Sequence, residues 1–96
     1  MGVDVDALLI VGAKGSDINV ESVTDNESLY EFAEENGMEI CSPYYDCCDY
    51  EEQIIGIEIS YYNNDEDLVK KIKEAKDKFL ELANTSGEFM AAPNVY

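Results

Sequence analysis

The sequence predicts an α+β fold in which four antiparallel strands form one sheet and two helices cover one of its faces. Segments with alternating apolar residues, typical of strands, are interleaved with segments of helical periodicity in the order β-α-β-β-α-β. This is the order of the ferredoxin-like fold, whose strand order is 4-1-3-2. The two prolines fall in the strands that this order places at the edges, where a missing N–H is tolerated. The 96 residues are enough for a single domain, residues 1–96, with one core.

The N-terminal part of the chain predicts a strand, a loop and a helix. Apolar residues at alternate positions predict a strand over residues 3–11, and residues 12–23 are predicted to form a loop. The following Thr-Asp-Asn-Glu sequence matches a capping box, with Thr24 as N-cap and Glu27 at the third helical position. Apolar residues at helical spacing and a terminating glycine then predict a helix over residues 25–36.

The C-terminal part predicts three further strands and a long second helix. These are strands over residues 38–45, 53–62 and 89–95 and a helix over residues 65–83. The helix has apolar residues at steps of four and three, which predict its core-facing side: Leu68, Ile72, Ala75, Phe79 and Leu82. Pro43 lies in the second predicted strand and Pro93 in the fourth, so both prolines are expected at the sheet edges.

Negative charge is the most unusual property of the chain. It has 22 acidic residues and six lysines, no arginine and no histidine, and a net charge of −16. Residues 1–64 contain 15 of the acids and one lysine, a net charge of −14, whereas residues 65–96 contain seven acids and five lysines, a net charge of −2. Solubility alone needs a net charge of roughly 2–8 in a small domain. Because an excess of this size causes self-repulsion, it predicts a cationic partner.

Several classes of function are disfavoured by the same composition. Direct binding to nucleic acid needs a basic surface, and so does binding to an anionic membrane. No apolar run reaches 18 residues, and acids occupy the N-terminal positions where a signal peptide has bases. Three cysteines, two of them adjacent, make a poor disulfide framework, so we expect a cytoplasmic protein. Without histidine or arginine, the usual general base and phosphate clamp are absent, and we expect neither a catalytic site nor a cofactor.

Two patterns that resemble metal sites are better explained as structural features. The cysteines at positions 41, 47 and 48 lack both the number and the spacing of zinc ligands. The acids at the start of the second helix follow EF-hand spacing from Asn63 to Glu74, but Leu68 stands where the calcium loop needs glycine. We therefore expect no metal site, only weak and non-specific binding of divalent cations.

Two acidic segments are the best candidates for contact with a partner. The predicted first helix has four outward glutamates without a lysine, and the predicted turn at residues 46–52 combines acids with tyrosines. Tyrosine is common at interface hot spots, although β-propensity also explains tyrosines near strands. The predicted partner-binding residues are Glu27, Glu31, Glu34, Glu35, Tyr45, Asp46, Asp49, Tyr50, Glu51 and Glu52.

These segments favour a non-catalytic inhibitor that mimics the charge of nucleic acid. A rigid scaffold spaces carboxylates about 6.6 Å apart along a strand and about 5–6 Å apart along a helix face. A basic protein that grips phosphates with lysine and arginine would then meet a preformed array of anions. In charge and size alone, the chain is similar to small phage-encoded inhibitors of restriction or CRISPR systems. The expected partner is a basic, nucleic-acid-binding protein.

A second hypothesis is a small cytosolic regulatory or assembly module that forms oligomers, such as a homodimer, through the sheet face without helices. The apolar residues expected on that face are Leu8, Ile10, Ile54 and Tyr62. This hypothesis predicts self-association that is insensitive to salt. A third hypothesis, an enzyme or metal site built on carboxylates, ranks last.

Overall fold

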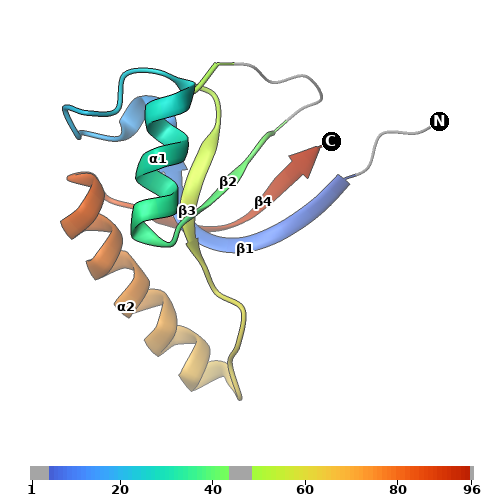
Figure 1. The fold of residues 1–96 in the computed structure, drawn as a ribbon. Coiled ribbons are helices and arrows are strands. Elements are labelled where there is room, and N and C mark those ends of the chain that lie inside the picture. Colours follow the sequence, from blue (N-terminus) through green and yellow to red (C-terminus); the bar gives the residue numbers. More distant parts are fainter. Residues whose placement is uncertain (1–4, 44–48, 96) are drawn as a thin grey trace.

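The computed structural model of the chain describes residues 5–43 and 49–95, which form a four-stranded sheet with two α-helices (Figure 1). The elements in chain order are β1 (Val5–Lys14), a 3-10 helix η1 (Gly15–Asp17), α1 (Asn26–Asn36), β2 (Glu39–Cys41), β3 (Ile54–Glu58), α2 (Asp65–Ala83) and β4 (Glu88–Val95).

The predicted antiparallel strand order is confirmed. The sheet runs β2-β3-β1-β4, and every neighbouring pair is antiparallel. Pro93 lies in the edge strand β4, as expected. The prediction for Pro43 was wrong, because β2 ends at Cys41 and Pro43 follows the strand instead of lying in it. An edge strand tolerates the missing N–H of proline, but the pairing of β2 with β3 ends at Cys41 and Ile54, before the proline is reached.

Both helices pack against the same face of the sheet and share its main hydrophobic core. α1 contributes Leu29, Phe32 and Ala33 to this core, and α2 contributes Ala75, Phe79 and Ala83. The sheet contributes the buried side chains of Val11, Ile55 and Ile59. The predicted core side of α2 is confirmed, because its remaining members, Leu68, Ile72 and Leu82, are half-buried against the same cluster.

β1 is longer at its C-terminal end than the sequence predicted. The predicted loop began at Gly12, whereas the strand continues to Lys14 and pairs Gly12 with Gly56 of β3. A Cβ on Gly56 would lie 2.6 Å from the Val11 carbonyl oxygen, so the backbones approach each other too closely for a side chain. The two glycines therefore permit the close contact that keeps β1 and β3 paired, and they do not terminate the strand.

The opposite face of the sheet has a small core of its own. Ile10, Cys41 and Ala92, from three different strands, are each completely buried, and Leu8, Ile54 and Met90 pack partly buried around them. The sheet is strongly coiled, and Figure 1 shows the β1–β4 pair curving away from the helices. Of the apolar residues expected on this face, Ile10 is thus buried, Leu8 and Ile54 are partly buried, and Tyr62 is exposed.

β3 is shorter than predicted, and this changes the position of two tyrosines. The predicted strand reached Tyr62, but β3 ends at Glu58. Ile59 still donates a backbone hydrogen bond to the Leu9 carbonyl (2.8 Å), after which the chain leaves the sheet. The Tyr61 side chain is 81% exposed and not part of the sheet, so periodicity alone misplaced it.

α1 is capped one residue later than the sequence predicted. Asp25, not Thr24, is the N-cap, and its carboxylate accepts a hydrogen bond from the Ser28 backbone N–H (2.8 Å). The Ser28 hydroxyl in turn accepts from the Asp25 N–H (3.0 Å), which completes a capping box without Glu27. Hydrogen bonding to Ser28, chiefly through its backbone N–H, holds the pKa of the Asp25 carboxyl below its ordinary value. The carboxylate is the better acceptor for the helix N-terminus because it is charged.

We expect Asp25→Ala to destabilise the protein more than Thr24→Ala does, because only the first removes the cap. The pKa of Asp25 is lower in the folded than in the unfolded chain, so its contribution is present above the unfolded value and is lost as the pH falls through the folded value. Thermal unfolding from pH 7 to pH 2.5 should therefore show the advantage of the wild type over Asp25→Ala shrinking below about pH 4. An advantage unchanged at the lowest pH would contradict this assignment.

Candidate interaction surface

The four glutamates predicted to contact a partner from α1 are all exposed. Glu27, Glu31, Glu34 and Glu35 point away from the sheet because Leu29, Phe32 and Ala33 hold the other side of the helix in the core. They leave the helix in more than one direction. Glu31 and Glu35 border a shallow hollow beside Phe32, whereas Glu34 borders another with Tyr30 and Glu39.

The second acidic segment is held beside the end of β1 by backbone hydrogen bonds. Gly15 donates to the Gln53 carbonyl (2.7 Å), and Ser16 donates to the Glu51 carbonyl (3.3 Å). Gln53 is buried and accepts a hydrogen bond from the Ser42 hydroxyl (3.0 Å). Tyr50 packs half-buried against the main core. The turn from Asp49 to Glu52 is therefore anchored at its base, and its three acids are exposed.

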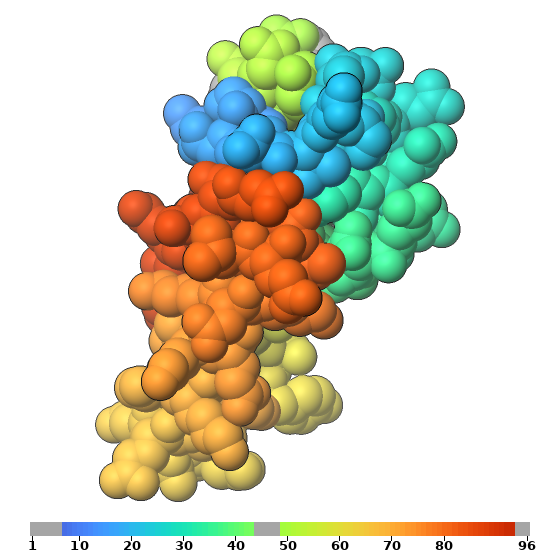
Figure 2. All heavy atoms as spheres, turned by 90° about the vertical axis from the view of Figure 1, so that its left-hand side faces the viewer, coloured from blue at the N-terminus to red at the C-terminus, as the bar shows by residue number. Residues whose placement is uncertain are grey.

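The fold brings these two acidic segments together. A hollow of about 420 Å³ lies between the start of α1 and the turn, and its charged lining residues are Asp25, Glu27, Asp49 and Glu51. Figure 2 shows the turn at the top of the molecule beside the start of α1, with α2 running toward the opposite end. We call the exposed acids of this region the acidic surface: Asp25, Glu27, Glu31, Glu34, Glu35, Asp49, Glu51 and Glu52.

Two of the predicted partner-binding residues, Tyr45 and Asp46, lie outside the described residues. Tyr50 is within them, but its half-buried position gives it a structural role as the anchor of the turn. Asp25 was not among the predicted contact residues and lies in the lining of the hollow. The sequence signal for Asp25 was its position directly after the predicted N-cap, Thr24, at the start of the helix.

Five of the six lysines lie on α2, a different element from those that carry the acidic surface. The sixth, Lys14, ends β1 next to Gly15, which hydrogen-bonds to the base of the turn. Lys71 forms an ion pair with Asp67 (3.8 Å) and donates a hydrogen bond to the Tyr61 carbonyl. The first turn of α2 contains three acids, and Asn64 caps it by accepting from the Asp67 N–H (2.9 Å). The segment with EF-hand spacing is thus a capped helix start, as predicted.

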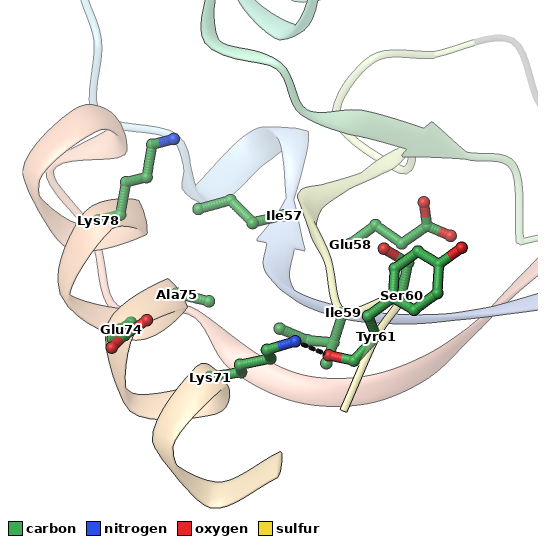
Figure 3. Close-up of a pocket in the computed structure, with 9 residues that line it drawn as sticks. All are labelled: Ile57, Glu58, Ile59, Ser60, Tyr61, Lys71, Glu74, Ala75 and Lys78. Carbon is green, nitrogen blue, oxygen red and sulfur yellow. Dashed lines mark hydrogen bonds between the residues drawn. The ribbon is translucent and has the colours of Figure 1, made fainter. Parts of the chain in front are cut away.

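A groove of about 360 Å³ separates α2 from the residues that follow β3 (Figure 3). Ile57, Ile59 and Ala75 line it with aliphatic side chains. Its charged residues are Lys71, Lys78, Glu58 and Glu74, which balance one another. The groove was not predicted from the sequence, although Lys71 and Lys78 are seven residues apart and therefore lie on the same side of the helix.

The residues of the second hypothesis do not form one exposed patch. Ile10 is completely buried, Leu8 and Ile54 are partly buried beside it, and Tyr62 lies beyond β3. Cys41 is buried in the same cluster, and burial, with the nearby charges of Glu39 and Glu58, raises the pKa of its thiol. Cys47 and Cys48 lie outside the described residues. Within residues 5–43 and 49–95, no three acids or cysteines are grouped closely enough to share a metal ion.

Comparison of the chain with protein-family models, curated proteins and solved structures found no match. Among the parts of the chain that the structure describes, neither helix combines the length and apolar character needed to cross a bilayer.

Proposed function

We propose that the chain is a non-catalytic cytoplasmic inhibitor with a ferredoxin-like fold, whose acidic surface mimics the charge of nucleic acid and docks on a basic, nucleic-acid-binding protein. The observation that supports this proposal is the hollow in which Asp25 and Glu27 of the α1 start face Asp49 and Glu51 of the turn. Segments more than twenty residues apart in sequence thereby contribute acids to one hollow, whose lining contains no lysine.

A fixed array of charges is a better decoy than a flexible acidic tail. Helix geometry places Glu27, Glu31 and Glu35 at successive four-residue steps, about 5–6 Å apart. Because α1 is held by its buried side and the turn by its hydrogen bonds to β1, little conformational freedom remains to be lost on docking. A basic partner would release its bound anions and gain a complementary surface, as it does on nucleic acid.

The test is displacement of a fluorescent DNA or RNA duplex from purified basic nucleic-acid-binding proteins, measured by anisotropy. We expect the wild-type chain to displace the duplex from its partner, and raising the salt from 50 to 200 mM to weaken the chain's own binding. Changing Glu27, Glu31, Glu34 and Glu35 to glutamine should weaken binding by about tenfold or more.

The matched control changes four exposed acids of α2 to their amides and leaves the acidic surface intact: Glu66, Glu74, Asp77 and Glu81. The net charge of both variants is the same. We expect the control to bind within about threefold of the wild type. Its four changed acids lie outside the proposed contact, and salt screens the attraction between distant charges and the partner. Equal loss in both variants would show that total charge, not the acidic surface, determines binding, and would contradict the proposal.

A further inference from the structure

The outer edge of β4 is unusual in so acidic a protein because the strand has little charge. Its one charged residue, Glu88, is at its start, and the stretch from Phe89 to Val95 has none. Phe89 is 38% exposed, and Ala91 and Pro93 are exposed as well. Edge strands are commonly protected by charged side chains, since an unprotected edge can pair with another strand. Beyond Glu88 at its start and Pro93, β4 lacks such protection.

The ladder shows which backbone groups of β4 point outward. The Leu9 carbonyl accepts a hydrogen bond from the Ile59 N–H, so the backbone N–H and C=O of Leu9 point toward β3. Because these groups alternate along a strand, those of Leu8 and Ile10 point toward β4. Their partners Ala92 and Met90 therefore bond back to β1. By alternation, the backbone groups of Phe89, Ala91 and Pro93 point away from the sheet. Pro93, which has no N–H to donate, is at a position where β1 does not need one.

Charge limits what can approach this edge. Two copies of a chain with a net charge of −16 repel each other, and contact through α1 or the turn would oppose carboxylates directly. β4 and the part of β1 from Ala7 to Ala13 form a ribbon without charge beyond Glu88. This ribbon is a place where a second copy can make contact without bringing like charges together.

From these observations we propose that β4 pairs with β4 of a second copy, so that the two sheets join into one across a two-fold axis. Met90 lies on the axis opposite Met90 of the second copy, and Phe89 pairs with Ala91 of that copy through the outward backbone groups. Registers that require an N–H from position 93 are excluded by the proline. In this register the two Glu88 side chains lie near opposite ends of the paired segment and do not face each other. The contact differs from the enclosed sheet face and leaves the acidic surface open.

Sedimentation velocity at increasing salt tests the pairing. We expect a dimer that becomes stronger between 0.05 and 0.5 M NaCl, because salt screens the repulsion between the two bodies. Binding to a basic partner should show the opposite salt dependence, so that failure of one proposal is distinguishable from failure of the other. Ala91→Pro removes an outward N–H and leaves the bonds to β1 intact, and it should give a monomer with an unchanged circular dichroism spectrum.

Cross-linking gives a second readout that does not depend on the proline variant. In a Cys47→Ser, Cys48→Ser background, Met90→Cys should form a covalent dimer with oxidised glutathione, because directly opposite residues are within disulfide reach. Val69→Cys, at an exposed position on α2, is the control and should not do so. A monomer at every salt concentration, or a dimer that Ala91→Pro leaves intact, would overturn the proposal.

Discussion

Replacing Phe79 with alanine should lower the free energy of unfolding by about 3–5 kcal/mol. Its ring is completely buried and belongs to the core shared by both helices and the sheet. It also lies against Gly87, where an added Cβ would be 2.8 Å from the ring, so the surrounding backbone is already in close contact. A cavity at this position cannot be filled by a small shift of neighbours. Since small domains are stable by only about 5–15 kcal/mol in total, the variant should be partly unfolded at moderate temperature.

Urea unfolding followed by circular dichroism measures this loss, and the adjacent residue provides the control. Leu80 is on the same turn of α2 but is 51% exposed, so Leu80→Ala should change the free energy of unfolding by only about 0.5 kcal/mol. Both variants shorten an apolar side chain of the same helix to a methyl group. A similar loss in both would mean that helix propensity, not burial, determines the stability of α2.

Gly56→Ala should destabilise the protein by about 3 kcal/mol, at the upper end of the range for overpacking. The new Cβ would be 2.6 Å from the Val11 carbonyl oxygen and 2.8 Å from the Gly12 Cα. Both neighbours are backbone atoms of β1, which cannot move without breaking the pairing of the two central strands. Because the sheet carries both cores, we expect the substitution to reduce the stability of the whole fold.

Gly37→Ala is the matched substitution, since it adds the same methyl group where nothing lies within 4 Å. Gly37 has a φ of +66° at the end of α1. Alanine in this left-handed conformation should lower the free energy of unfolding by about 1–2 kcal/mol, without any steric clash. Thermal or urea unfolding of the two variants separates the steric cost from the conformational cost. A larger loss for Gly37→Ala than for Gly56→Ala would contradict the close approach of β1 and β3.

The features of the fold that repeat along the sequence were predictable. The spacing from Leu68 to Leu82 predicted the buried side of α2, and the strand patterns with Pro93 predicted the antiparallel order of the sheet. The uneven distribution of charge was also visible, because five of the six lysines lie within residues 70–78. These properties depend on periodicity and composition, which a single sequence contains in full.

The features that depend on contacts between distant residues were not predictable. Gly12 looks like the end of a strand until Gly56 is placed opposite it. The cap of α1 is a local exception, because Thr24 and Asp25 both suit the N-cap position and the hydrogen bonds with Ser28 decide in favour of Asp25. The hollow in the acidic surface requires the hydrogen bond from Gly15 to Gln53, which joins residues far apart in the chain. No local pattern indicates such a contact.

The segregation of lysines onto α2 also bears on how the proposed inhibitor would approach its partner. Negative charge is densest around the acidic surface, whereas α2 carries five lysines beside its six acids, so the molecule has an electric dipole moment in addition to its net charge. The field of a basic partner exerts a torque on that dipole and turns the α1 end forward before the surfaces touch. The fraction of collisions in a productive orientation rises, so the charge layout should accelerate association more than it prolongs the lifetime of the complex.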